Sequence, residues 1–278
     1  MHKYNFCIGL REDFGLPIEK QLEKLKAYGF DAFFTECSEN VPKYKELADK
    51  LGLVYQSVHA PSVNAAKLWQ SGDEAKAAKK ELLECISLCV RNEIPTLVIH
   101  AYEGFDGMFI PTMQGFENFN EIVDDAAAFD VNIAVENTAG YPYLEALLEG
   151  YAYCDRVGFC WNSGHELCYN KGADLLSRFG SRLTCITLND NFGMRGETLS
   201  AADDMHLLPF DGITDWERVA ARLSKCSYDG FLTLDIRKAG VSMKDGITKY
   251  EDMTFEKFLD YAFGCAYKLR TLIKRQPL

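Results

Sequence analysis

Side chains that can bind metal ions or transfer protons recur in this sequence directly after short apolar runs. The run Val157–Trp161 is followed at once by Asn162, a Ser-Gly turn and His165. An apolar run with a polar end and a tight turn is typical of a buried parallel strand that ends at a site. About eight such apolar runs occur, and most have a polar end. The polar residues at or next to these ends are Glu36, His59, His100, Glu136, Asn162, Thr187, Asp190 and Asp235.

Histidine is concentrated at the same places. Four of the five histidines, His59, His100, His165 and His206, fall at or just after the ends of apolar runs, and Asp204 lies two residues before His206. Imidazole and carboxylate groups serve as metal ligands and as general acids or bases. Capping or an ordinary hydrogen bond explains each residue by itself equally well. The whole set favours an enzyme-like cavity, provided that the runs end at one place.

The elements that must position these residues alternate along the chain. Apolar runs predict strands, and between them helical spacing, Pro starts and Gly ends predict helices. The predicted strands are Phe6–Leu10, Asp31–Glu36, Leu53–His59, Thr96–His100, Val131–Glu136, Val157–Trp161, Leu183–Leu188 and Phe231–Asp235. The predicted helices are Pro17–Gly29, Pro42–Leu51, Asp73–Asn92, Gln114–Phe129, Tyr143–Gly150, Asp174–Phe179, Thr214–Ser224 and Phe255–Ile273.

Eight alternations predict an α/β fold of the (β/α)8 TIM-barrel type, as one domain over residues 1–278. An open doubly wound sheet would usually carry a glycine-rich phosphate loop after its first strand. Arg11–Gly15 stands there instead, without a G-x-G-x-x-G motif. In a TIM barrel all strands end at one mouth, where active sites lie. The polar strand ends are therefore expected to meet.

Composition narrows the class of protein. The net charge of −11 argues against a nucleic-acid partner, because binding to phosphate backbones depends on Lys and Arg. No apolar run approaches the roughly 18 residues of a membrane span, and we expect no membrane association. The N-terminus has no signal-peptide pattern, and the ten cysteines include no C-x-x-C pair. We expect a cytoplasmic protein with reduced cysteines, in which Cys85 and Cys89 share a packed helix face.

Several motifs resemble one known family. They are H-A-P at His59–Pro61, V-E-N at Val135–Asn137, C-W-N-S-G-H at Cys160–His165, T-L-N-D-N at Thr187–Asn191 and H-L-L-P-F-D-G-I-T-D-W at His206–Trp216. In this order they resemble the xylose isomerase-like TIM barrels over nearly the whole chain. That superfamily includes sugar and sugar-phosphate isomerases and epimerases, inosose dehydratases and endonuclease IV.

The resemblance to the epimerase branch implies a divalent metal ion (Mn, Mg, Co or Zn) and two catalytic carboxylates. The catalytic pair falls on Glu136 and Asp235, which with Asn162 would also be the metal ligands. Asn162 stands where the family has Asp, and Thr187 stands where it has His. These changes remove a negative charge and an imidazole, and Asp235 is one methylene shorter than the family's Glu. A metal site of the family type is weakened accordingly.

The resemblance to endonuclease IV implies three zinc sites, of which the two outer ones are intact and the central one has lost its Asp and His. The outer sites fall on His59, His100 and Glu136, and on His165, Asp204 and His206. The acidic net charge argues against a nuclease. The second set remains an alternative metal site, because His and Asp suit Zn²⁺.

The function that the resemblance implies is that of a sugar or sugar-phosphate isomerase or epimerase, and hence an enzyme. Trp161, Tyr102 and Phe192 are candidates for an apolar wall, and Arg195 and Arg237 for binding a phosphate or carboxylate. The alternative is a non-catalytic, sugar-binding barrel that has lost its metal site through Asn162 and Thr187. Aromatic residues near the mouth make a homo-oligomer an expectation as well. The predicted substrate-binding residues are Glu36, His59, His100, Asn162, His165 and His206.

Overall fold

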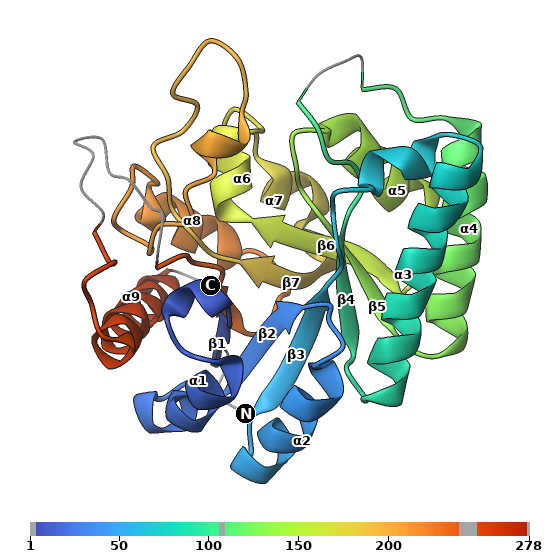
Figure 1. Cartoon of the computed structure of the whole chain (residues 1–278). Helices are drawn as coiled ribbons and strands as arrows, with labels where there is room; N and C mark the ends of the chain where they lie inside the picture. Colours follow the sequence, from blue (N-terminus) through green and yellow to red (C-terminus); the bar gives the residue numbers. More distant parts are fainter. Residues whose placement is uncertain (1–3, 106–108, 239–248, 277–278) are drawn as a thin grey trace.

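A computed structural model describes residues 4–105, 109–238 and 249–276. Its strands form one sheet in the order β7-β6-β5-β4-β3-β2-β1-β8, and every neighbouring pair is parallel. A parallel bridge between Leu188 and Leu234 brings β7 to β8 and closes the barrel. Helices lie around the sheet (Figure 1). The prediction of a (β/α)8 TIM barrel is confirmed.

The strands follow the predicted apolar runs closely, because those runs are buried on both faces. They are β1 (Phe6–Gly9), β2 (Ala32–Glu36), β3 (Val54–His59), β4 (Thr96–His100), β5 (Asn132–Glu136), β6 (Val157–Asn162), β7 (Leu183–Thr187) and β8 (Leu232–Leu234). Most strands are one residue shorter than predicted at one end or at both ends. Strand β6 is one residue longer and ends at Asn162. The residue at which each of β2 to β5 ends matches the prediction.

The helices also match the sequence pattern, with one addition. They are α1 (Ile18–Leu25), α2 (Val41–Leu51), α3 (Asp73–Arg91), α4 (Met113–Ala128), α5 (Tyr141–Gly150), α6 (Ser163–Cys168), α7 (Leu175–Phe179), α8 (Trp216–Leu223) and α9 (Phe255–Arg275). The unpredicted helix α6 replaces the expected Ser-Gly turn. It forms because the Asn162 side chain accepts a hydrogen bond from the His165 backbone N–H and so caps the first turn.

Short 3-10 turns complete the elements at η1 (Glu12–Phe14), η2 (Lys26–Tyr28), η3 (Ala65–Trp69), η4 (Gly180–Arg182) and η5 (Ala201–Asp203). The predicted helix end at Gly52 is a left-handed C-cap with φ of 64°. None of the helices in the described part of the chain has the length and apolarity needed to cross a membrane.

The barrel interior is filled by side chains below the mouth. Cys7 Sγ and Thr233 Oγ1 both donate to Gln56 Oε1, each at 3.0 Å. Cys160 and Cys185 pack together with Val98 and Ala134 in a separate buried cluster. A filled interior leaves the C-terminal mouth as the place where a small molecule can bind.

Candidate functional site

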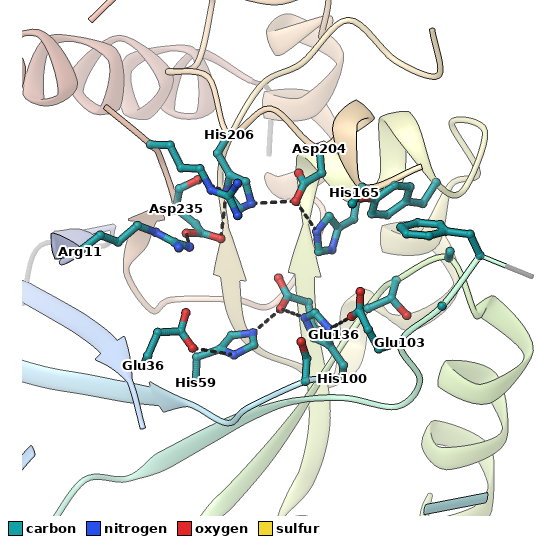
Figure 2. A pocket seen from close by; sticks show the side chains of 18 residues that line it. Arg11, Glu36, His59, His100, Glu103, Glu136, His165, Asp204, His206 and Asp235 are labelled. Carbon is teal, nitrogen blue, oxygen red and sulfur yellow. Dashed lines mark hydrogen bonds and ion pairs between the residues drawn. The ribbon is translucent and has the colours of Figure 1, made fainter. Parts of the chain in front are cut away.

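A cavity of about 240 Å³ lies at the C-terminal ends of the strands. Figure 2 shows two rows of polar side chains that face each other across it. The charged and imidazole side chains in its lining are Arg11, Glu36, His59, His100, Glu103, Glu136, His165, Asp204, His206, Asp235 and Arg237. All the predicted strand-end histidines are therefore brought together, with five carboxylates around them.

The first row is centred on Glu136, the last residue of β5. Its Oε2 lies 3.0 Å from His59 Nε2 and 3.1 Å from His100 Nε2. The other ring nitrogens are also engaged, since His59 Nδ1 lies 2.8 Å from the Ala60 carbonyl and His100 Nδ1 lies 2.7 Å from Glu103 Oε2. We call His59, His100 and Glu136 the first cluster.

The second row repeats this pattern around Asp204. Its Oδ2 lies 3.1 Å from His165 Nε2 and 2.7 Å from His206 Nε2. His165 Nδ1 lies 2.8 Å from the Asn137 carbonyl, and His206 Nδ1 lies 2.9 Å from the Asp235 carbonyl. We call His165, Asp204 and His206 the second cluster.

Both nitrogens of each of these four rings face oxygen acceptors. A neutral imidazole has one N–H and one lone pair, so it can satisfy only one of the two. Each ring must therefore carry a second proton or share a cation with the carboxylate at its Nε2. Burial opposes the charged ring, but hydrogen bonds to Glu103 and Glu136 raise the pKa of His100 to about 10. The charges of Asp204 and Asp235 likewise overcome burial and raise the pKa of His206 to about 10.

The pKa values of the other two histidines are also raised, and those of the two central carboxyls are lowered. The pKa of His59 and that of His165 are both raised, because nearby carboxylates outweigh the effect of burial. Burial works against ionisation of Glu136 and Asp204, yet the histidines hold the pKa of each carboxyl well below its usual range. The cavity thus carries closely paired positive and negative charges.

Each cluster has the donors of a transition-metal site. The ligand atoms within a cluster all lie within 4.8 Å of one another. Two imidazoles and one carboxylate suit Zn²⁺ and related ions, and a carbonyl or carboxylate at each Nδ1 is the usual support of such ligands. The Oδ1 atom of Asp204 is also buried without a hydrogen-bond partner among the described residues, as an unfilled ligand position would leave it. The residues present therefore fit two divalent ions.

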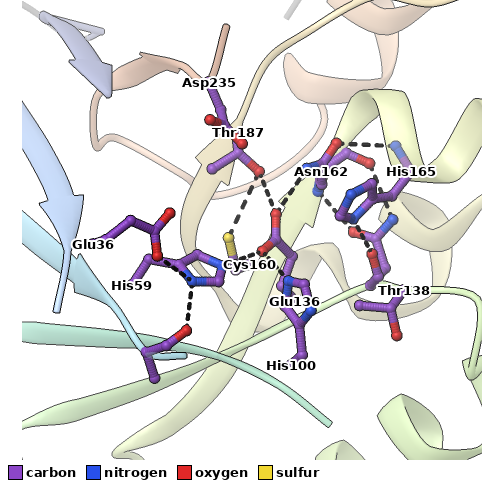
Figure 3. Close-up of polar contacts among 12 residues, drawn as sticks. Glu36, His59, His100, Glu136, Thr138, Cys160, Asn162, His165, Thr187 and Asp235 are labelled. Carbon is purple, nitrogen blue, oxygen red and sulfur yellow. Dashed lines mark hydrogen bonds and ion pairs between the residues drawn. The ribbon is translucent and has the colours of Figure 1, made fainter. Parts of the chain in front are cut away.

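The predicted ligand Asn162 does not line the cavity. Figure 3 shows its polar contact with Glu136. Its Nδ2 donates to Glu136 Oε1 at 2.8 Å, and Thr187 Oγ1 donates to the same oxygen at 2.9 Å. The Asn162 Oδ1 accepts from the His165 backbone N–H and from Asn189 Nδ2. Asn162 thus hydrogen-bonds Glu136 and caps α6, and its carbonyl oxygen is already occupied.

Asp235, just after β8, is held by an arginine that sequence analysis did not select. Arg11 Nη2 lies 2.6 Å from Asp235 Oδ1, and His206 Nδ1 lies 3.3 Å from its Oδ2. Burial disfavours the ionised carboxyl, but the charges of His206 and Arg11 lower its pKa. Glu103 was also missed; its only signal in the sequence is its place three residues after His100, in the loop that follows β4.

Two predicted members of the mouth are structural instead. Asp190 is fully buried and accepts hydrogen bonds from the backbones of Phe210 and Thr214 and from Trp216 Nε1. It holds the loop before α8, away from the cavity lining. Trp161 is a packing residue, and its Nε1 donates to the buried Glu166 at 2.8 Å.

Of the other side chains predicted for the mouth, only one lines the cavity. Tyr102 stacks on Tyr143 with ring centroids 4.5 Å apart, and neither it nor Phe192 lines the cavity. Arg195 lies against Asp203, whereas Arg237 does line the mouth. The aromatic part of the lining is formed by Phe105 and Tyr169, whose ring centroids are 5.3 Å apart.

A family model described as xylose isomerase-like TIM barrel matches residues 22–253. An uncharacterized protein of Sinorhizobium fredii, y4fM, is 35% identical over 119 residues, which are 41% of this chain and 36% of that protein. The chain thus matches little more than a third of the length of this relative. An uncharacterized protein of Methanocaldococcus jannaschii, MJ1311, is 24% identical over 86% of this chain and 87% of its own length.

Solved structures with the same fold were also found. A xylose isomerase domain protein from Planctomyces limnophilus has a TM-score of 0.73 at 14% identity, covering 98% of both chains. D-psicose 3-epimerase with D-tagatose, from Clostridium cellulolyticum, has a TM-score of 0.70 at 16% identity, covering 96% of this chain and 99% of that one. The IolI protein with a binding zinc atom has a TM-score of 0.65 at 15% identity, covering 98% and 99%. At these identities the likeness is one of fold.

Proposed function

Because this chain belongs to the xylose isomerase-like TIM barrel family, we propose that it is a metal-assisted isomerase or epimerase of a small sugar or sugar phosphate. The observation that carries the proposal is that Glu136, which belongs to the first cluster, and Asp235 both line one small cavity, and that this cavity also holds the second cluster. The structural likeness to D-psicose 3-epimerase supports the same class of chemistry.

Glu136 and Asp235 are the proposed proton carriers. They stand at the ends of β5 and β8, which are separated by β6 and β7 on one side of the barrel. One carboxylate would take the proton from the carbon next to the substrate carbonyl. The other would return a proton to the neighbouring carbon or to the opposite face. Arg11 would keep Asp235 ionised and fixed between turnovers.

The lowered pKa values of both carboxyls make them weak bases. Abstraction of a carbon-bound proton therefore requires strong stabilisation of the enediolate oxygen. Divalent ions held by the first and second clusters would supply Lewis-acid stabilisation of that oxygen. The neutral Nδ1–H tautomer of each histidine would be enforced by the acceptor at its Nδ1, which leaves the Nε2 lone pair for the ion.

The proposed substrate is small and rich in hydroxyl groups. The cavity of about 240 Å³ is below the roughly 300–1,000 Å³ of sites for drug-sized ligands, and a monosaccharide suits it better. Glu36 and Glu103 would accept hydrogen bonds from hydroxyls, while Phe105 and Tyr169 would cover an apolar face. Arg237 is the residue that would contact a phosphate if the substrate carries one.

Solvent hydrogen exchange tests this proposal whichever product is formed. The zinc-loaded protein would be incubated in D₂O with D-fructose, D-psicose, D-tagatose and phosphorylated ketoses, and carbon-bound deuterium would be measured by NMR. We expect deuterium at a carbon next to the carbonyl of at least one sugar. Glu136→Gln and Asp235→Asn should each abolish exchange, whereas Glu217→Gln, on the exposed face of α8, should leave it unchanged. Absence of exchange in every sugar would refute the enzymatic proposal.

A sugar-binding barrel without catalysis is the second candidate. It is favoured by Asn162 and Thr187, which donate hydrogen bonds to Glu136 where the family resemblance implies metal ligands. Ligand binding in calorimetry, together with no deuterium exchange in any bound sugar, would identify this second function. Exchange that depends on Glu136 would exclude it.

A further inference from the structure

Two cysteines outside the cavity lie unusually close to each other. Cys37 is the first residue after β2, and Cys85 lies on the buried face of α3. Their Sγ atoms are 2.9 Å apart, and the Cys85 thiol donates toward Cys37. A disulfide bond is about 2.05 Å long, so the sulfurs need to approach by only about 0.85 Å to form one. Both residues are free thiols in the structure.

The two thiols differ in the way that a reactive pair requires. Cys37 is partly exposed, whereas Cys85 is buried. The hydrogen bond from Cys85 lowers the pKa of the Cys37 thiol, and donating that bond, together with burial, raises the pKa of Cys85. The thiolate is the nucleophilic form of cysteine. Cys37 is therefore the residue that meets an oxidant first, and Cys85 the one that follows.

We propose that Cys37 and Cys85 are a redox-active pair that forms a reversible disulfide on reaction with a hydroperoxide. The Cys37 thiolate attacks one peroxide oxygen, the O–O bond breaks, and the departing oxygen takes up a proton to leave as water or alcohol. Cys37 is then a sulfenic acid. The Cys85 sulfur attacks the Cys37 sulfur, the S–O bond breaks, and the hydroxide leaves as water with the Cys85 proton. Two thiols are oxidised by two electrons, and one peroxide is reduced.

The charges around Cys37 select the class of oxidant. Glu36, Glu81 and Glu84 each act to raise the pKa of the Cys37 thiol, because they surround it with negative charge. The same charges repel anionic disulfides such as oxidised glutathione and do not repel a neutral hydroperoxide. Hydrogen peroxide is accordingly the oxidant expected to react faster.

The bond would connect two elements that position the cavity from outside it. The Cys37 backbone N–H donates to the His59 carbonyl at 2.8 Å, so the end of β2 is already tied to the end of β3. Neither cysteine lines the cavity. The proposal goes beyond the isomerase function and does not depend on it.

Peptide mapping tests the pair directly. The full-length protein, reduced and then freed of reductant, would be treated with one equivalent of hydrogen peroxide and digested with trypsin without reduction. Cys37 lies in the tryptic peptide of residues 27–43 and Cys85 in that of residues 81–91. We expect these peptides to be linked, with a loss of about 2 Da that dithiothreitol reverses. Oxidation elsewhere, or Cys37 oxidised without this link, would overturn the proposal.

Variants identify the partner, because Cys89 shares the peptide of residues 81–91. Cys85→Ala should abolish the link and leave Cys37 open to further oxidation, whereas Cys89→Ala should preserve it. Cys37→Ser, at a partly exposed position, must abolish the link even if Cys85→Ala folds poorly. Cys226→Ser is the matched control, since Cys226 is also partly exposed but donates to the Arg222 carbonyl. A link that persists in Cys85→Ala refutes the assignment.

Discussion

Loading the two clusters with zinc is expected to release about four protons from the protein near pH 6.5, two for each ion. In the absence of a metal ion, each of the four histidines faces acceptors at both ring nitrogens, at distances between 2.7 and 3.1 Å. Each ring therefore needs two protons. A bound ion takes the place of the proton at Nε2.

The exchange of protons for zinc leaves the net charge of the cavity unchanged, so it adds no net charge to a buried site. Two divalent ions carry the same charge as the four protons that they replace. The pKa values of His100 and His206 are both raised to about 10, so protons compete with zinc for these two rings throughout the neutral pH range. With two protons displaced per ion, the apparent affinity for zinc should rise about 100-fold for each pH unit over which both histidines of a cluster stay charged.

Calorimetry measures the number of protons released on zinc binding directly. Zinc titrations at pH 6.5 in buffers with different ionisation enthalpies give the protons released as the slope of observed heat against buffer enthalpy. His59→Gln and His165→Gln should each remove one binding event and about half of the protons. The matched control is His2→Gln, at a histidine that belongs to neither cluster and lies outside the described residues. A slope below about one proton per ion, or an affinity that is constant between pH 6 and 8, would refute the argument.

Three further predictions follow from the same contacts. Glu103→Gln should weaken zinc at the first cluster by about 10- to 100-fold, because Glu103 supports the ring of His100, and should leave the second cluster unchanged in calorimetry. Asp190→Ala should lower the free energy of unfolding, measured in urea, by about 3 kcal/mol without reducing zinc content. The substitution leaves buried donors such as Trp216 Nε1 unpaired. Unchanged stability would contradict the structural role of Asp190. The metal-free protein should lose thermal stability as the pH rises from about 6.5, the unfolded pKa of histidine, to about 10. A histidine pKa that is raised by folding stabilises the protein fully below this interval and progressively less across it. A melting temperature that is flat over this interval would be inconsistent with charged histidines.

The strand ends could be predicted from the sequence because burial and chemistry change at the same residue. β2, β3, β4 and β5 end at Glu36, His59, His100 and Glu136, where the apolar run stops. Parallel strands in a closed barrel all end at one mouth. Once the fold was predicted, the convergence of these side chains followed from topology alone.

The direction of side chains beyond the strand ends could not be predicted in this way. Asp190 lies three residues after β7 and turns toward the loop that precedes α8, where it accepts from two partly buried backbone N–H groups. Glu103 and Arg11 reach the cavity from loops, where no periodic pattern indicates orientation. Their positions depend on the path of the loop in three dimensions, which neither composition nor spacing specifies.

The contacts of Glu136 explain why two changes that weaken a central metal site are compatible with intact outer clusters. An Asp at position 162 would bring a second carboxylate to about the 2.8 Å that now separates Asn162 Nδ2 from Glu136 Oε1, and such a pair requires a bound cation or a shared proton. Asn162 and Thr187 instead satisfy Oε1 with two neutral donors. The other oxygen, Oε2, is thereby turned to His59 and His100 and belongs to the first cluster alone. Neutral donors at Oε1 thus add no further charge next to the first cluster.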